Sequence, residues 1–181
     1  MRRTDLLAQL AHYRPADALE TRHHRDIAAL VAAAPAAFER THFTPGHITA
    51  SLFIVDGGGA LLLHHHRRLN RWLQMGGHVE ADERPADAAL REGAEESGLR
   101  DLELAIDGIF DLDVHVIPAA KGEPEHRHYD VRYVARTATP HAVVLDRSES
   151  NDLAWVPFDR AEALMDEAAS SRAIQKIRSR L

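Results

Sequence analysis

A cluster of acidic residues in the middle of the chain is the feature of the sequence with the clearest capacity for chemistry. Glu95 and Glu96 follow Glu92 by three and four positions, so on a helix all three occupy one connected surface within little more than a turn. Like charges at this spacing repel one another, whereas hard divalent cations such as Mg²⁺ prefer carboxylate oxygens as ligands. The spacing therefore predicts either a metal-binding face or a solvated acidic face.

Neighbouring residues favour metal binding. Arg91 precedes Glu92 and lies four positions before Glu95, so its guanidinium can neutralise one carboxylate and hold it in place. Glu83, in the loop before the helix, can fold back over the same face, and the carbonyls of Gly76-Gly77 can approach an ion closely because no side chain obstructs them. For an isolated Glu-Glu pair, the solvated alternative would be the commoner one.

The segment from residue 77 to residue 99 resembles the Nudix box, G-x5-E-x7-R-E-U-x-E-E-x-G-U, where U is a bulky apolar residue. Agreement at this many fixed positions rarely arises by chance. The matching residues are Gly77, Glu83, Arg91, Glu92, Glu95, Glu96, Gly98 and Leu99. One position departs, because Gly93 stands where the family has a bulky apolar residue. Glycine inside a helix costs about 1 kcal/mol relative to alanine, so we expect weaker helix packing there.

The resemblance implies roles for these residues, and it extends to a bacterial MutT-like subgroup with only a generic functional description. In the family, the corresponding acids bind Mg²⁺ or Mn²⁺, and a carbonyl before the box often joins them. The implied metal ligands are Gly76, Glu92, Glu95 and Glu96. Glu83 is implied to orient the other acids, and Arg91 to pair with one of them.

The reaction implied by the resemblance is hydrolysis of a phosphoanhydride bond in a nucleoside-diphosphate-linked or similar small molecule by metal-activated water. The general base of the family is often a glutamate outside the box. Glu149, in the loop before Trp155, is the candidate, and a solvated loop acid is the equally weighted alternative. A different class of function is a Nudix-fold nucleotide-binding or regulatory module without turnover. Such modules usually lose a ligand, so the intact box argues against it.

Histidine and aspartate alternate in two later segments. His126, His128 and Asp130 share one face of a strand, as do Asp111, Asp113 and His115 on the strand before. If the two strands form a hairpin, His115 lies near His128 and Asp113 near Asp130. The pattern predicts an imidazole-rich part of the active-site wall that contacts phosphate or a second metal. The alternative is a polar face whose side chains hydrogen-bond one another.

Further residues are candidates for the same wall. His64 and His66 alternate in the same way, and His78 lies beside the box. Trp72 can stack on a base, although aromatic residues near strands more often belong to the core. The candidate substrate contacts are His115, His126, His128 and Trp72.

The elements that position these residues follow from periodicity and from glycine and proline. They indicate an α/β fold, which the resemblance specifies as a Nudix α/β/α sandwich with a mixed β-sheet. We expect a helical N-terminal extension at 1–42, packed on a Nudix hydrolase domain at 43–181. The predicted strands are 48–54, 60–63, 102–117, 129–135 and 153–156; the predicted helices are 85–97, 159–165 and 170–181; 67–77 is a predicted loop.

Composition limits the function classes. The 181 residues are 45% hydrophobic with a net charge of -6 and two lysines, Lys121 and Lys176, so we expect no nucleic-acid partner. No cysteine is present, which excludes thiolate metal sites and disulfides. The apolar run 27–37 is too short to span a membrane, and no export signal is evident. We therefore expect a cytoplasmic protein without a membrane partner; dimers are common in the family, so a homodimer is a further expectation.

Overall fold

A ten-residue strand in which every residue is buried, β1 (Gly46–Val55), forms the centre of the molecule. In the computed structural model, which describes residues 2–120 and 122–181, β1 pairs in parallel with β7 (His126–Arg136) over its whole length. Its other edge pairs antiparallel with β4 (Met75–His78) and β2 (Ala60–His66). A strand that is paired on both edges and covered on both faces is not exposed to water. Its last four residues are accordingly all apolar.

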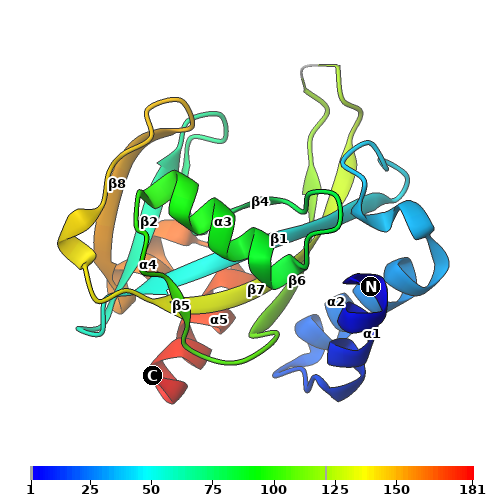
Figure 1. Ribbon diagram of the computed structural model, residues 1–181, viewed down its shortest axis with the longest axis horizontal. Coiled ribbons are helices and arrows are strands. Elements are labelled where there is room, and N and C mark those ends of the chain that lie inside the picture. The colour runs from blue at the N-terminus through cyan, green and yellow to red at the C-terminus, as the bar shows by residue number, and fades with distance from the viewer. Residues whose placement is uncertain (1, 121) are drawn as a thin grey trace.

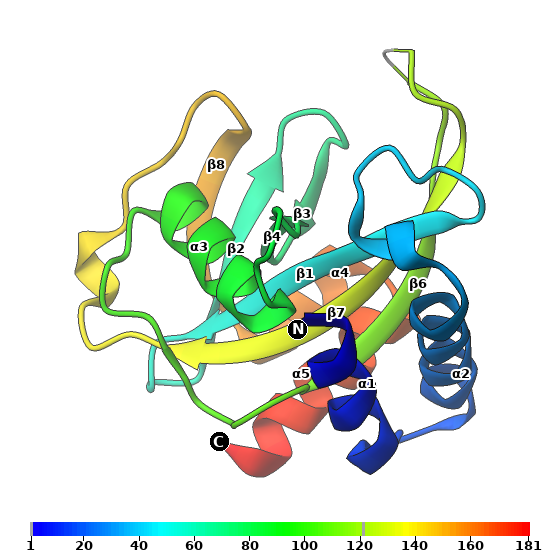
Figure 2. The same cartoon turned by 45° about the vertical axis from the view of Figure 1, so that its right-hand side comes forward.

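The remaining strands extend this mixed sheet in the order β3-β2-β1-β7-β5. They are β3 (Arg71–Leu73), β5 (Glu103–Leu104), β6 (Asp111–Ile117) and β8 (Ser150–Pro157). Strand β6 pairs antiparallel with β7, and β8 pairs antiparallel with β2. Figure 2 shows the β6–β7 hairpin projecting from the body of the molecule.

Helices cover both faces of the sheet (Figure 1). Helix α3 (Pro85–Ser97) crosses one face, and α4 (Phe158–Met165) and α5 (Ala168–Arg180) lie behind the other. Of the N-terminal helices, α2 (Ala18–Ala33) packs beside β6, and α1 (Arg2–His12) packs on α2. Two 3₁₀ turns, η1 (Pro35–Phe38) and η2 (Pro140–Ala142), complete the described structure. The fold is therefore the predicted α/β/α sandwich with N-terminal helices ahead of it.

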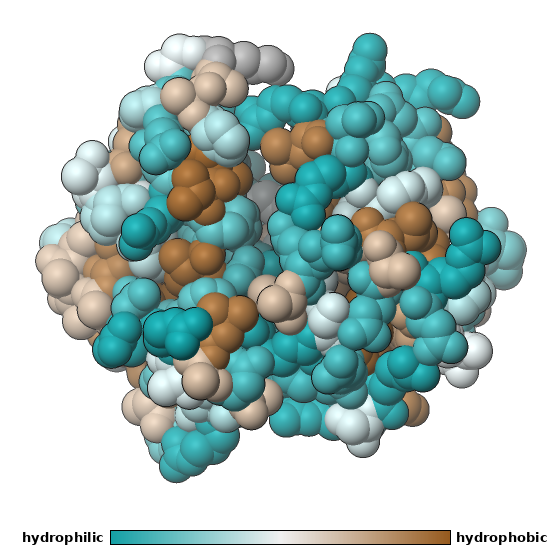
Figure 3. Space-filling model, turned by 180° about the vertical axis from the view of Figure 1, so that it is seen from behind, coloured by the Kyte–Doolittle hydropathy of each residue, from teal (hydrophilic) through white to brown (hydrophobic). Residues whose placement is uncertain are grey.

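Two hydrophobic cores lie on the two faces of the sheet. On β1, Leu52 and Ile54 pack into the core shared with α3 and with the N-terminal helices, and Phe53 and Val55 pack into the core shared with α4 and α5. Because successive side chains of a strand point to opposite faces, His47 must share the face of Phe53. The outer surface behind the sheet carries only small hydrophobic patches among hydrophilic side chains (Figure 3).

Several predicted elements differ from the observed ones. The predicted loop 67–77 contains β3 and β4, which are too short to produce a periodic pattern. The predicted strand 102–117 is interrupted, because Gly108 turns the chain at φ 78° between β5 and β6. The last strand begins at Ser150, earlier than its apolar residues suggested. By contrast, the predicted antiparallel pairing places Asp113 opposite Asp130 and His115 opposite His128.

A buried network of charges connects the N-terminal helices to the C-terminal one. Asp111 accepts hydrogen bonds from Arg172 at 2.8 and 3.0 Å and from Lys176 at 3.0 Å. Lys176 also donates to Glu20 at 2.8 Å and to the hydroxyl of Tyr13 at 2.8 Å. Since Glu20 and Asp111 are both 0% exposed, each charge depends on its partners for stabilisation.

The same network continues into the sheet through Arg132. Its guanidinium donates to Asp130 at 2.9 Å and to Asp113 at 2.8 Å. Asp130 also accepts hydrogen bonds from the hydroxyls of Thr49 and Ser51. Burial alone would raise the pKa of Asp113, but the charge of Arg132 outweighs burial and holds that pKa below its usual value.

We predict that the N-terminal helices unfold together with the sheet. Replacing Glu20 with Met leaves the buried ammonium of Lys176 short of a partner and should lower the free energy of unfolding by roughly 3–5 kcal/mol. Combining Glu20→Met with Lys176→Met should recover part of that loss, because a buried ion pair replaced by apolar groups is often tolerated. Urea denaturation gives the free energy of unfolding of the parent protein and of both variants. The control, Glu39→Ala at an exposed position, should change stability by less than about 0.5 kcal/mol; a similarly small effect of Glu20→Met would contradict the prediction.

Candidate functional site

Helix α3 carries the acidic cluster and has the predicted bounds. It begins at Pro85, whose missing N–H is not needed in the first turn. It ends at Ser97, and the following Gly98 caps it in the left-handed conformation at φ 74°. The acids therefore lie on one face of a helix with defined ends.

Arg91 lies at the centre of the acidic cluster. It donates to Glu83 at 3.0 and 3.1 Å, to Glu92 at 2.9 Å and to Glu95 at 3.2 Å. It also donates to the backbone carbonyl of His78 at 3.0 Å. Hydrogen bonds with Glu83 are the largest cause of the raised pKa of Arg91. One cation thus neutralises part of three carboxylates and ties the loop before α3 to the helix.

Glu96 lacks such a cationic partner. Its side chain is buried, with 4% of the residue exposed, and its carboxylate accepts a hydrogen bond from the N–H of Gly76 at 2.8 Å. Among the described residues, no arginine or lysine pairs with it; His64 lies 3.8 Å away, and burial lowers the pKa of that imidazole to about 4. Burial raises the pKa of Glu96 to about 8, and the negative charge of Glu92 adds to the effect.

Two consecutive glycines let strand β4 approach both β1 and α3 closely. A Cβ at Gly76 would lie 2.6 Å from the hydroxyl of Ser51 and 2.7 Å from the carbonyl of Ala50. A Cβ at Gly77 would overlap the carboxylate of Glu92. Position 76 therefore requires glycine, whereas a side chain at position 77 would displace the flexible carboxylate of Glu92. The backbone of β4 forms one wall of the acidic site.

Gly93, the departure from the box, has a physical explanation. A Cβ at this position would lie 2.5 Å from a methyl group of Leu52 on β1 and 3.2 Å from one of Leu102. These two leucines occupy the space that a bulky residue at position 93 would need. The expectation of weak packing is therefore wrong, because the glycine is buried and α3 continues through it without interruption.

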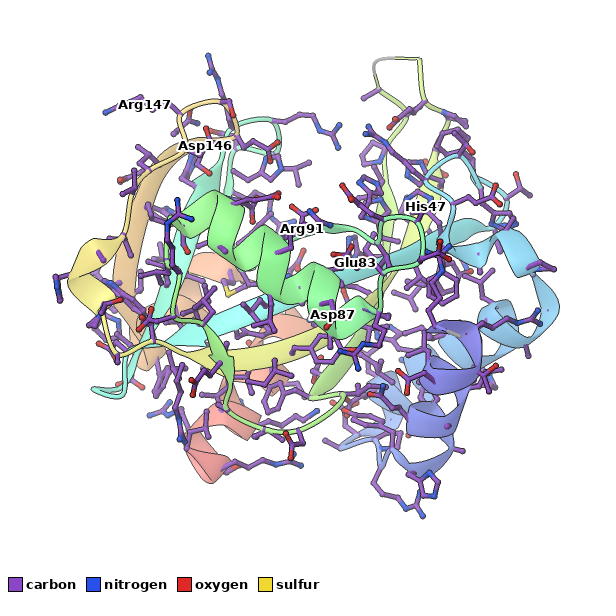
Figure 4. All side chains as sticks on the ribbon, viewed as in Figure 1. His47, Glu83, Asp87, Arg91, Asp146 and Arg147 are labelled. Atoms are coloured by element: carbon purple, nitrogen blue, oxygen red, sulfur yellow. The ribbon has the colours of Figure 1, made fainter. Side chains whose placement is uncertain are left out.

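The loop before β8 borders the acids. Glu149 is exposed in this loop, and its charge contributes to the raised pKa values of Glu96 and Glu92, although burial is the largest cause at both. Figure 4 shows Asp146 and Arg147 on the same loop, beyond the C-terminal end of α3. The predicted catalytic residues thus lie on α3 and in the loop before it, with Glu149 in the loop before β8.

The predicted histidines divide into two groups. His126 and His128 lie close together, with ring centroids 5.2 Å apart, and His78 joins them at 5.5 Å from His128. His115 lies at the edge of this group and bonds to Asp113 at 2.9 Å. His47, on β1, is a member that the sequence analysis missed, because only parallel pairing with β7 places it opposite His128.

The other candidates lie elsewhere. His64 and His66 face each other on β2, with ring centroids 5.5 Å apart, and His64 bonds to Ser150 at 2.7 Å. Trp72, on β3, packs against His65 and the core on the α4 side. Trp72 is therefore not brought together with the predicted histidine contacts.

The residues of the acidic site suit a hard divalent cation. Carboxylate oxygens and a backbone carbonyl are the donor types that Mg²⁺ and Mn²⁺ select. A buried carboxylate without a cationic partner, beside a second partly buried one, is the arrangement that a cation would stabilise most. The predicted ligands Glu92, Glu95, Glu96 and Gly76 thus offer suitable donor types, although among the described residues the three carboxylates do not all have oxygens within 4.8 Å of one another.

Comparisons with known proteins identify the family of the chain. The family model described as NUDIX domain matches residues 45–177. No curated protein matches the sequence.

Solved structures share the fold. An Ap4A hydrolase from C. elegans, in a binary complex, is 23% identical over 73% of this chain and 95% of its own, with a TM-score of 0.60. RenU, a Nudix hydrolase from M. smegmatis, is 25% identical over 74% and 84%, with a TM-score of 0.55. The dihydroneopterin triphosphate pyrophosphohydrolase of E. coli is 18% identical over 71% and 92%, with a TM-score of 0.56.

We predict that Gly93→Leu destabilises the protein, because the new side chain competes with Leu52 for the same space. Overpacking of this kind typically costs about 1–3 kcal/mol. The double variant Gly93→Leu/Leu52→Ala should be more stable than the sum of the two single effects, with a coupling energy of about 1 kcal/mol or more. Urea denaturation of all four proteins gives this coupling, and purely additive effects would show that the two side chains do not compete.

We predict an alkaline loss of stability caused by Glu96 in metal-free protein. Between the ordinary pKa of 4.5 and the raised pKa of about 8, the folded state keeps a proton that the unfolded state has released. The free energy of unfolding should therefore fall as the pH rises through this window, by at most about 1.4 kcal/mol per pH unit. Glu96→Gln should remove this component, so its stability relative to the parent protein should increase from pH 5 to pH 8. A pH-independent difference between the two proteins would refute the prediction.

Proposed function

The chain belongs to the NUDIX domain family and is a Nudix hydrolase, and we propose that it cleaves a diphosphate bond in a nucleoside-diphosphate-linked or similar small molecule. The observation that carries the proposal is Glu96, a buried carboxylate without a cationic partner among the described residues, in the middle of an intact box. The Ap4A and dihydroneopterin triphosphate hydrolases with this fold act on substrates of this general class.

In the proposed site, Glu92, Glu95, Glu96 and the carbonyl of Gly76 would hold Mg²⁺ or Mn²⁺. A divalent ion bound there supplies charge neutralisation of the diphosphate, a lowered pKa of water and stabilisation of the leaving oxyanion. The raised pKa of Glu96 suits this role, because a carboxylate destabilised by burial gains most from a nearby cation.

Arg91 and Glu83 are proposed to position the ligands. Arg91 holds Glu92 and Glu95 in place through separate hydrogen bonds, and Glu83 holds the guanidinium from the opposite side while accepting the N–H of Glu80 at 3.0 Å. Because these contacts use some carboxylate oxygens, the remaining ones are left for the ion.

Glu149 is proposed as the general base that accepts a proton from the attacking water. Its support is its location in an exposed loop near the acids, where its charge contributes to the pKa values of Glu92 and Glu96. The exposed guanidinium of Arg67 donates to the backbone carbonyl of Arg147 at 3.1 Å. This contact brings two arginines to the same rim, where they would attract an anionic substrate.

Other properties stay predictions of the sequence. No described helix is both long and apolar enough to cross a membrane. A cytoplasmic location, a homodimer and the absence of a nucleic-acid partner stay predictions. The second candidate function, a nucleotide-binding or regulatory module without turnover, is an outcome of the experiment below.

We predict that the protein hydrolyses at least one member of a panel of nucleoside diphosphate derivatives in the presence of Mg²⁺ or Mn²⁺. Glu96→Gln should lower kcat by more than the roughly 10–100-fold that follows loss of a residue that only orients a metal ligand. Glu149→Gln should lower kcat by about 10²–10⁴-fold if it is the base.

Product release measured by chromatography or phosphate detection tests these effects, with Glu103→Gln at an exposed position on β5 as the control. Thermal unfolding checks that the variants are folded. Wild-type protein that binds the nucleotides without product would favour the binding module. Full activity of Glu96→Gln would contradict the proposal that Glu96 is a metal ligand.

A further inference from the structure

Three histidines from two parallel strands converge on the face of the sheet opposite α3. His47 comes from β1, and His126 and His128 come from β7. One ring nitrogen of each lies within 4.8 Å of a ring nitrogen of the other two. These residues are separate from the carboxylates of the acidic site, and we call them the histidine cluster.

The imidazole rings of the cluster form no hydrogen bonds with one another among the described residues. Among the described residues, no hydrogen bond joins His47, His126, His128 or the adjacent His78, although their ring centroids lie 4.9–5.5 Å apart. The Nε2 atom of His47 is buried without a hydrogen-bond partner, and the residue is 1% exposed. Buried polar atoms normally have a partner, so this nitrogen is free to bind a ligand.

Backbone carbonyls orient two of the rings. Nδ1 of His126 lies 2.8 Å from the carbonyl of Pro124, and Nδ1 of His47 lies 3.4 Å from that of His42. Donation from Nδ1 leaves the lone pair on Nε2. Histidines that bind metals are commonly held in this way, with the second nitrogen donating to a carbonyl or carboxylate.

Two members of the cluster, His47 and His128, are neutral at physiological pH. Burial lowers the pKa of His47 to about 4 and that of His128 to about 2, and the neighbouring imidazoles lower both further. A neutral imidazole is the form that binds a metal. Phe43 packs on the cluster, with its ring centroid 5.0 Å from that of His126, and shields one side from water.

We propose that His47, His126 and His128 bind a divalent transition-metal ion, zinc by preference, as a second metal site distinct from the carboxylates of α3. Imidazole nitrogens suit Zn²⁺ and other late first-row ions, whereas Mg²⁺ requires oxygen ligands. Three protein ligands leave a fourth tetrahedral position for water, for an anion or for His78, whose ring centroid lies 5.1 Å from that of His47.

Only modest movement is needed to close the site. Zinc–nitrogen bonds of about 2.0–2.1 Å place tetrahedral ligand atoms about 3.4 Å apart. From separations of at most 4.8 Å, the rings would converge by no more than about 1.5 Å, which side-chain rotation supplies. The ion would join β1 to the base of the β6–β7 hairpin, beside the strand that carries Gly76 and Gly77.

The test is zinc binding by the full chain, freed of metal with a chelator and dialysed against Zn²⁺ in excess Mg²⁺, which competes for the carboxylates. Bound zinc per chain is measured by elemental analysis, and the visible absorption of Co²⁺ reports tetrahedral nitrogen coordination. The variants are His47→Gln and His128→Gln. The controls are His141→Gln, at an exposed position, and Glu96→Gln, which removes a proposed ligand of the acidic site.

The expected result is one zinc ion bound by the parent protein and by both controls, with affinity lowered at least about a hundredfold in His47→Gln and in His128→Gln. The Co²⁺ absorption should be lost in the same two variants. Zinc binding that survives both substitutions, that disappears in Glu96→Gln, or that is no tighter than millimolar in the parent protein overturns the proposal. Circular dichroism of the metal-free proteins identifies a misfolded variant. If one histidine variant is misfolded, zinc binding by the other one tests the proposal.

Discussion

The carboxylate of Glu96 imposes the constraint on which the acidic site depends. A buried carboxylate is costly unless charge or hydrogen bonds compensate it, and here the compensation is one backbone N–H from Gly76. Arg91, the nearest cation on the helix, is already engaged by three other acids and by a carbonyl. The fold therefore disfavours the charged form of Glu96, whose pKa burial raises to about 8, and a nearby cation would stabilise that charged form.

The buried network on the other side of the molecule shows the opposite arrangement. Asp111, Asp113 and Asp130 are as buried as Glu96, yet each contacts Arg132 or Arg172 directly. Their charges are consequently stabilised, and the pKa values of Asp111 and Asp113 are lowered although burial acts to raise them. The comparison shows that the fold is able to pair a buried acid with a cation. The missing partner at Glu96 is thus a specific property of that site, as expected where a ligand completes the charge balance.

Sequence patterns predicted the features that depend on interactions between residues close together in the chain. Helix α3 and its cap at Gly98 follow from Pro, Gly and the helical period, and the pairing of Asp113 with Asp130 follows from alternation within one hairpin. Contacts between distant segments were not predictable. His47 lies opposite His128 only because β1 and β7 pair in parallel, a register that no turn specifies. Glu20 and Lys176 resemble surface residues of amphipathic helices, and nothing local indicates that they meet inside the protein.

Strand β4 links the two sites that the structure suggests. Gly77 and His78 are adjacent, so they point to opposite faces of the sheet: the missing side chain of Gly77 admits Glu92, and the ring of His78 lies beside His47 and His128. Arg91 donates hydrogen bonds to the backbone carbonyl of His78 and to the acids of the site. A shift of His78 towards an ion in the histidine cluster would therefore act on the same short strand that shapes the acidic site. Because one site offers oxygens and the other nitrogens, the two would select different metals, and each could be filled without competition from the other.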